Sequence, residues 1–437
     1  MLSVLPTWIL IPLLILCGAV VGGFINWAIY SWTIVLRRSI SPWQNPAEGA
    51  SAPAATDRIP VYGWWQRRRD SEVHGKGFWV RPLLIELVWT IGLPLFYFWQ
   101  MSGGLTGGNP PSPLWGETWF FAHGILLVLM CIGTFIDFDE KTIPDQITIP
   151  GTIIALLFAA LAPWSRLPEV IPGWAPPPTI DSIYYGSPHK LVDLHLGTTG
   201  LLIVLAVWTI WIWALLPKLP VWYVGFKNWI RFMFAYAIQP KRKTKCEFRV
   251  RPRRMPMETK ILACLFVVGL VAIFLAWKFL PPIHWVSLFG AFLGMAFAGG
   301  IIWAIRVLGT LALQQEAMGF GDVTLWAMVG AFLGWQAALM GFFYAPFTAL
   351  AIVLFLWIMK RENEIAFGPY LCMGAAITLM GWFPIWRRTS QGVFRLGVWL
   401  WIIFAGALVL LVVMLLVIAW YKGMFRPMDE EGDDEDH

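Results

Sequence analysis

Runs of about twenty apolar residues recur along the whole chain, and this feature restricts the fold more than any other. A helix of that length just crosses the hydrocarbon core of a bilayer, which is about 30 Å thick. Because lipid offers no water to the backbone, a spanning segment must satisfy its hydrogen bonds internally, as a helix does. Only 13% of the 437 residues are charged, against about a quarter in soluble domains. The sequence therefore predicts an all-α, polytopic helical membrane protein.

Eleven segments are apolar enough to be predicted as membrane-spanning helices. The first is longer than a signal-peptide core and has no basic segment before it, so we expect it to be a retained span. The eleven are residues 7–30, 83–101, 118–137, 147–163, 197–216, 260–280, 285–307, 322–338, 340–359, 369–385 and 397–420.

The basic residues predict the orientation of these spans. Loop 37–82 holds eight and loop 217–259 holds eleven, whereas segments 102–116 and 281–284 hold none. Lysine and arginine accumulate in cytoplasmic loops, so we expect both basic loops in the cytoplasm and the N-terminus outside. The net charge of +6 arises from these loops, and it does not indicate a nucleic-acid partner.

Counting spans then places residues 138–146 and 308–321 on the cytoplasmic side as well. Arg387, Arg388 and Arg395 disagree with the pattern, because the count puts their loop outside.

Several other features indicate packing or solvation rather than chemistry. The repeats "GAVVG" and "GAFLG" favour close helix contacts. Loop 217–259 contains aromatic and basic residues that fit either an interfacial helix or an irregular connector. The acidic C-terminal run is predicted to be a solvated tail. The cysteines form no C-x-x-C pair, so no metal site is expected, and four of them are expected to pack within spans: Cys17, Cys131, Cys264 and Cys372.

Three carboxylates stand out at the edges of the apolar runs: Glu86, Asp137 and Asp322. Ionisable groups at such positions are costly and mark candidate functional sites. Asp137 ends the third predicted span and Asp322 opens the eighth, both at the expected cytoplasmic end. They are 185 positions apart in sequence but at the same membrane depth, so we expect them to meet.

Two facing carboxyl groups suit one reaction in particular. Like charges a few ångströms apart cannot both ionise, so one group keeps a proton at neutral pH. The ionised group can deprotonate a water, and the protonated group can donate to a carbonyl oxygen, as in aspartic proteases. Neither a metal nor a cofactor is needed for such proteolysis. Gly319 and Gly321, in "GFGD", are predicted to turn tightly and to let an extended substrate backbone approach Asp322.

Five motifs, in order, resemble those of the prepilin peptidases, or type IV leader peptidases. "GAVVGGFINWAIYSW" is similar to the first-helix motif of that family, and "RIPVYGWW" with "FWVRPLLIELV" to the end of its first cytoplasmic loop. "FIDFDEKTIPDQITIP", which contains Pro144 and Asp145, resembles the block that carries the first catalytic aspartate. "MGFGDVTLWAMVGAFLGW" resembles the G-x-G-D block, and "IAFGPYL" the last motif.

The resemblance implies an aspartic endopeptidase of the bacterial plasma membrane, with its active site facing the cytoplasm. Its substrates would be precursors of type IV pilins or type II secretion pseudopilins, from which it removes the leader. Its other partner would be the lipid bilayer. The family's catalytic pair corresponds to Asp137 and Asp322, rather than to Asp139. Gly319, Gly321, Pro144 and Asp145 fall in the same motifs and are expected to position the pair; otherwise Asp145 caps the next helix.

Three departures from the family pattern affect what the resemblance implies. Loop 37–82 lacks the two C-x-x-C pairs of many members, which puts methyl transfer from S-adenosylmethionine in doubt. Thr324 stands where a lysine is common. Residues 197–280 insert two spans, an even number that keeps Asp322 on the side of Asp137.

The predicted organisation follows from these motifs. It comprises a first transmembrane helix (1–36), a basic loop (37–82), spans carrying the first catalytic aspartate (83–163), an atypical insertion (164–284), a peptidase core with GxGD (285–385), an extra span (386–420) and an acidic tail (421–437).

Two other function classes compete with the peptidase. An ion- or proton-coupled transporter would place acids near the bilayer midplane and show two similar halves. A catalytically impaired assembly protein built on a peptidase-like frame would explain Thr324 and the missing cysteines, although the retained aspartate pair argues against it.

Overall fold

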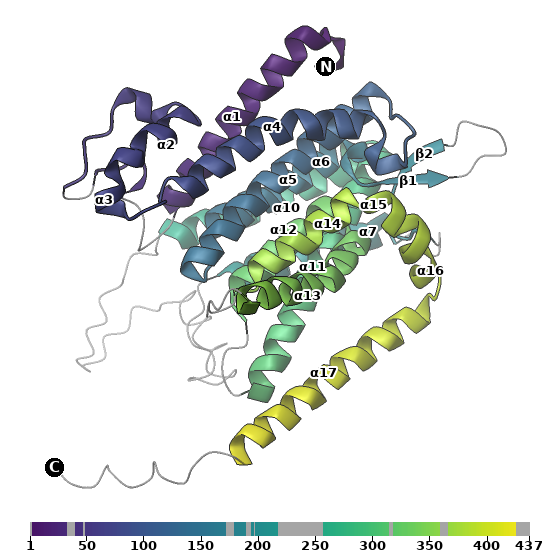
Figure 1. The fold of residues 1–437 in the computed structure, drawn as a ribbon. Helices are drawn as coiled ribbons and strands as arrows, with labels where there is room; N and C mark the ends of the chain where they lie inside the picture. Colours follow the sequence, from purple (N-terminus) through teal and green to yellow (C-terminus); the bar gives the residue numbers. More distant parts are fainter. Residues whose placement is uncertain are drawn as a thin grey trace, which may run out of the picture. The chain divides into compact units, whose positions relative to one another are not determined.

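The computed structural model of the chain describes residues 2–32, 40–46, 49–171, 179–188, 194–195, 197–216, 257–313, 318–358 and 366–424. These residues are helical apart from turns and one short hairpin, which confirms the predicted all-α membrane architecture (Figure 1). The longer helices are α1 (Thr7–Trp32), α4 (Val80–Met101), α5 (Pro113–Glu140), α6 (Asp145–Leu161), α7 (Gly197–Leu215), α10 (Met257–Phe279), α11 (Pro282–Leu313), α12 (Phe320–Leu333), α13 (Trp335–Ile358), α14 (Gly368–Met380) and α17 (Val398–Met424).

A helix lies at each of the eleven predicted positions. Among the described residues, eight are long and apolar enough to cross a membrane, namely α1, α4, α5, α7, α10, α11, α13 and α17. Helices α6 and α12 are apolar but shorter, with 17 and 14 residues.

The tenth predicted span, residues 369–385, is not one straight helix. Helix α14 ends before Gly381, and the chain then bends by 80° into the helical segment Trp382–Phe394. This segment comprises α15 (Trp382–Pro384), a π-helical turn (Ile385–Ser390) and α16 (Gln391–Phe394). Gly381 at the break and Pro384, which lacks an N–H group, explain why the first helix does not continue.

The hairpin was not predicted. Strand β1 (Pro168–Ile171) pairs antiparallel with β2 (Thr179–Ser182), and Pro168 lies opposite Ser182. Each strand has only four residues, which is too short for an alternating pattern to stand out in the sequence.

The chain divides into two compact units, residues 194–280 and the remainder. In the smaller unit α7 and α10 pack antiparallel. Trp208 Nε1 donates to Phe266 O at 3.2 Å, and Trp277 Nε1 donates to Gly197 O at 3.1 Å. The aromatic and basic part of loop 217–259, with its predicted interfacial helix, and the acidic tail from residue 425 lie outside the described residues.

The glycine repeats allow close helix contacts in the larger unit, as predicted. Gly18 and Gly22 lie directly against the backbone of α4, where any Cβ would overlap Trp89 O or, at 2.7 Å, Glu86 Cα. Gly294 of α11 and Gly330 of α12 face each other in the same way, each against the other's carbonyl oxygen. Of the cysteines expected to pack, Cys372 is buried, whereas Cys17 and Cys264 lie on exposed helix faces.

Helix α12 is the central helix of the larger unit. All its residues from Asp322 to Leu333 are buried, and it contacts α5, α6, α11, α13 and α14 (Figure 1). A helix enclosed in this way does not need to reach both membrane surfaces, which is consistent with its 14 residues.

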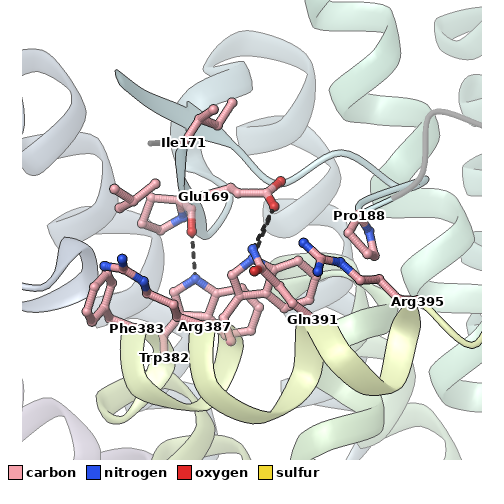
Figure 2. A pocket seen from close by; sticks show the side chains of 11 residues that line it. Glu169, Ile171, Pro188, Trp382, Phe383, Arg387, Gln391 and Arg395 are labelled. Atoms are coloured by element: carbon pink, nitrogen blue, oxygen red, sulfur yellow. Dashed lines mark hydrogen bonds between the residues drawn. The ribbon is translucent and has the colours of Figure 1, made fainter. Parts of the chain in front are cut away.

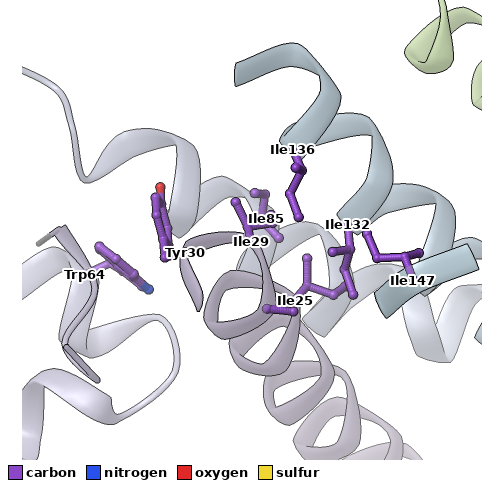
Figure 3. Packing of buried hydrophobic residues seen from close by; sticks show 9 residues of the cluster. Ile25, Ile29, Tyr30, Trp64, Ile85, Ile132, Ile136 and Ile147 are labelled. Carbon is purple, nitrogen blue, oxygen red and sulfur yellow. The ribbon is translucent and has the colours of Figure 1, made fainter. Parts of the chain in front are cut away.

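A cluster of buried isoleucines joins α1, α4, α5 and α6 to the first loop (Figure 3). Ile132 and Ile136 of α5 are fully buried in it, together with Ile25 and Ile29 of α1. Because Ile136 directly precedes Asp137, this packing fixes the end of α5 from which the aspartate projects.

Candidate active site

Asp137 lies in the last turn of α5 and is only 5% exposed. Its Oδ2 accepts a hydrogen bond of 3.1 Å from the backbone N–H of Gly368, which is 231 positions away. Gly368 opens α14, and the first N–H groups of a helix have no partner within it. The structure therefore directs one of these free donors at the carboxylate of Asp137.

Asp322 lies in the first turn of α12 and is 8% exposed. Gly321, the residue before Asp322, and Gly368, which donates to Asp137, lie against the same side chain: a Cβ at either glycine would lie 2.9 Å from an atom of Ile143. The fold thus places the two aspartates that the sequence pairs close to one residue, Ile143. The buried carboxylate oxygen Oδ1 of Asp322 accepts no hydrogen bond from the described residues.

The two glycines of "GFGD" have different surroundings. Neither Gly319 nor Gly321 has a positive φ, so a left-handed backbone is not what calls for glycine at these two positions. Gly321 is needed for a close approach, because a Cβ there would lie 2.9 Å from Ile143 Cβ and 3.1 Å from Ile143 O. Gly319 is exposed at the N-terminus of α12, and a Cβ there would meet Asp322 Oδ2 at an ordinary 3.9 Å.

Pro144 and Asp145 form the start of α6, next to this contact. Pro144 is the N-cap residue and Asp145 is the first residue of the helix, so the alternative of Asp145 as the cap is wrong. An acid in the first turn still favours the helix dipole. Thr324 Oγ1 donates to Gly321 O at 3.0 Å and closes the first turn of α12.

Glu86 was noticed in the sequence, but its partners were not foreseen. Its Oε1 accepts 2.9 Å hydrogen bonds from Asn26 Nδ2 and Trp64 Nε1, and its Oε2 accepts one from Val61 N. Asn26 also donates to Pro82 O at 2.9 Å. This carboxylate therefore ties α1, α4 and the first loop together.

Asp139, near the catalytic candidate Asp137 in sequence, forms a two-pronged ion pair. Arg81 Nη1 and Nη2 donate to its two carboxylate oxygens at 2.8 and 2.7 Å. The pair joins the start of α4 to the end of α5, two residues after Asp137. No spacing rule links residues 58 positions apart, so the sequence alone gave no signal for it.

The first loop folds around charged side chains instead of cysteines. Arg67 is 1% exposed and lies 3.6 Å from Asp70, while Arg69 Nη2 lies 2.7 Å from Asp57. Burial lowers the pKa of Arg67 despite both nearby carboxylates. In the described part of the chain, no three His, Cys, Asp or Glu side chains gather as a metal site.

Comparison with known proteins supports the resemblance. The sequence model of the type IV leader peptidase family matches residues 253–354, a range that includes Asp322. The chain resembles the type IV leader peptidases. Proteins named prepilin leader peptidase/N-methyltransferase are similar to it, and the predicted recognition is thereby confirmed.

The relatives come from several bacteria. The protein of Burkholderia pseudomallei (strain K96243) is 32% identical over 142 residues, covering 28% of this chain and 46% of its own. That of Escherichia coli (strain K12) is 31% identical over 96 residues, covering 22% and 43%, and that of Dickeya chrysanthemi is 37% identical over 95 residues, covering 21% and 32%. The chain thus matches less than half the length of these relatives. No solved structure matches it.

Proposed function

We propose that the protein is a membrane aspartic endopeptidase that removes the leader from type IV prepilins or type II secretion pseudopilins. The observation that best supports the proposal is that the residues next to the two aspartates, Gly321 beside Asp322 and Gly368 hydrogen-bonded to Asp137, both lie against Ile143. The resemblance to prepilin leader peptidases supplies the substrate class. The active site would face the cytoplasm from the bacterial plasma membrane.

The two carboxyl groups divide the proton transfers of peptide hydrolysis. Because two buried like charges at close range repel, the pair holds one proton between them. The ionised carboxylate removes a proton from the attacking water. The protonated carboxyl donates its proton to the oxygen of the scissile carbonyl as the tetrahedral intermediate forms. Both transfers are made by the pair itself, so this hydrolysis uses no cofactor.

The surroundings of the pair suggest which member is ionised. Asp137 accepts the N–H of Gly368 at a helix N-terminus, an arrangement that stabilises a negative carboxylate. Asp322 has an oxygen without a partner among the described residues, and this oxygen is available to carry and donate the proton. We therefore assign Asp137 as the base and Asp322 as the acid for the first step.

The shape of the site fits the substrate class. A pilin precursor presents a basic leader followed by an apolar helix, so its scissile bond lies where the helix leaves the membrane. Gly319 is exposed beside Asp322 and has no side chain to obstruct an extended backbone. The apolar helix of the substrate would lie among the spans, with the junction across these glycines.

Cleavage of a co-expressed prepilin tests the proposal. We expect Asp137→Asn and Asp322→Asn each to lower the rate by about 10² to 10⁴ or more, because each removes one proton-transfer group. Asp139→Asn is the matched control, and we expect it to cleave at nearly the wild-type rate. Full cleavage by either of the first two variants, inserted at normal levels, would refute the pair. The mass of the processed N-terminus reports in the same assay whether a methyl group is added.

A further inference from the structure

A pocket of about 230 Å³ lies between the hairpin and the helical segment Trp382–Phe394 (Figure 2). At roughly 30 Å³ per water molecule, it has room for about seven waters, or for a small polar group. Helix α14 separates it from the aspartates, because that helix begins at Gly368 beside Asp137 and ends before Gly381. Thirteen helical residues rise about 20 Å, so the pocket is distinct from the active site.

The floor of the pocket is rigid and aromatic. Trp382 and Trp386 are buried and stack with ring centroids 5.1 Å apart and an interplanar angle of 18°. Trp382 Nε1 donates to Pro168 O at 2.7 Å, and Trp386 Nε1 donates to Glu169 Oε1 at 3.3 Å. These bonds hold the hairpin against the helical segment and keep the pocket in shape.

Cationic side chains flank a single carboxylate in this pocket. Arg387 and Gln391 lie four residues apart in the helical segment and Arg395 directly follows its end, and all three line the pocket (Figure 2). Glu169 lies opposite, and its carboxylate accepts hydrogen bonds from Gln391 Nε2 at 3.2 Å and Ser187 Oγ at 2.9 Å. Arg387 lies over the ring of Phe383 at 5.6 Å and has no carboxylate partner among the described residues.

The pocket residues lie close in sequence to the start of a candidate membrane span. Helix α17, the most apolar of the candidate spans, begins three residues after Arg395. The 80° bend after α14 turns the segment Trp382–Phe394 away from the direction of the preceding helix. Arginine and tryptophan beside the end of a span are typical of the head-group region.

We propose that this pocket binds the zwitterionic head group of a phospholipid that carries a primary amine, such as phosphatidylethanolamine. The phosphodiester would accept hydrogen bonds from Arg387 and Arg395, which suits the planar donors of guanidinium groups. The ammonium group would donate to Glu169, which, unlike a fully buried carboxylate, is half-buried and lines the open pocket. The site also accounts for arginines that disagree with the positive-inside pattern.

Native mass spectrometry of the full-length protein tests this site. The protein is equilibrated with phosphatidylethanolamine or phosphatidylglycerol in detergent, and the lipid retained during stepwise delipidation is measured. We expect wild type to retain phosphatidylethanolamine preferentially. Arg387→Gln and Arg395→Gln should each weaken retention about tenfold. Arg388→Gln is the matched control, because Arg388 is exposed in the same turn but does not line the pocket.

The variant Glu169→Gln tests recognition of the ammonium group independently of recognition of the phosphodiester. Its amide oxygen preserves an acceptor for the hairpin contacts, so we expect the variant to retain phosphatidylglycerol as well as phosphatidylethanolamine. Equal retention of both lipids by wild type, or an equal loss in Arg388→Gln, would overturn the proposal. If soluble glycerophosphoethanolamine displaces the lipid at equal concentration, the site binds the head group without the membrane, and the proposal of a lipid ligand is wrong.

Discussion

Two regions of the larger unit bury carboxylates at the ends of spans, and they treat them in opposite ways. Glu86 is 2% exposed and accepts three hydrogen bonds, from Asn26, Val61 and Trp64. Asp322 is buried beside a second carboxylate, and one of its oxygens has no partner among the described residues. A buried carboxylate with its acceptors filled by neutral donors contributes to the structure, whereas a pair with unused capacity is available for chemistry.

The comparison teaches that burial alone does not identify a catalytic acid in a membrane. All three acids were selected by the same rule, that an ionisable group in a span is costly. Their partners distinguish them. The following predictions test whether that distinction holds, beginning with the largest effect expected apart from loss of an aspartate.

Gly368→Ala is expected to damage the aspartate pair. A Cβ at this position would lie 2.5 Å from Asp137 Oδ2, so the carboxylate or the start of α14 must move. Displacement of a catalytic group by about 1 Å can cost roughly 10²-fold in rate. Gly92→Ala, in α4, is the matched control, because a Cβ there would meet no atom within 4 Å, and it should cleave within a few-fold of wild type. Equal rates for the two variants would show that the N–H contact of Gly368 is unimportant.

Glu86→Gln is expected to affect stability rather than chemistry. The amide keeps an acceptor for Asn26 and Trp64 but turns a donor toward Val61 N, so one buried hydrogen bond is lost. We expect the free energy of unfolding to fall by about 1–3 kcal/mol, measured by thermal denaturation in detergent. Cleavage per folded molecule should be unchanged. Glu72→Gln, at an exposed acid in the first loop, should change neither quantity. A Glu86→Gln protein that folds normally but cannot cleave would show that Glu86 takes part in cleavage, and would contradict the distinction drawn between Glu86 and Asp322.

The smallest effect is expected at the ion pair of Arg81 and Asp139. The two side chains are 25% and 10% exposed, so their mutual interaction is partly screened by solvent. A double-mutant cycle with Arg81→Gln and Asp139→Asn should give a coupling of about 1 kcal/mol in stability. A coupling seen in cleavage but not in stability would mean that the pair acts on the site.

The sequence predicted the parts of the site that depend on membrane depth. Asp137 and Asp322 could be paired by counting spans, since each acid borders an apolar run. The family motifs then selected Asp137 over Asp139, although the structure shows a different reason for the glycines of "GFGD". Gly321 is required by the closeness of Ile143, a contact between segments remote in sequence.

The remaining features depend on side-chain contacts that no local pattern encodes. The N–H of Gly368 reaches Asp137 only because α14 packs against α5. Likewise the bend after α14 and the hairpin at Pro168 arise where short segments fit around one another, held by Trp382. Periodicity finds elements but does not report which residues of distant elements meet.

The most direct test of the central claim is the cleavage rate of the double variant Asp137→Asn/Asp322→Asn, compared with each single variant in the same membranes. Catalytic groups that act as one unit are strongly non-additive. If the two carboxyl groups share one proton and one reaction, the double variant will be no slower than the slower single variant. If the losses of the two single variants multiply in the double variant, the aspartates act independently and the account of a shared catalytic pair is wrong.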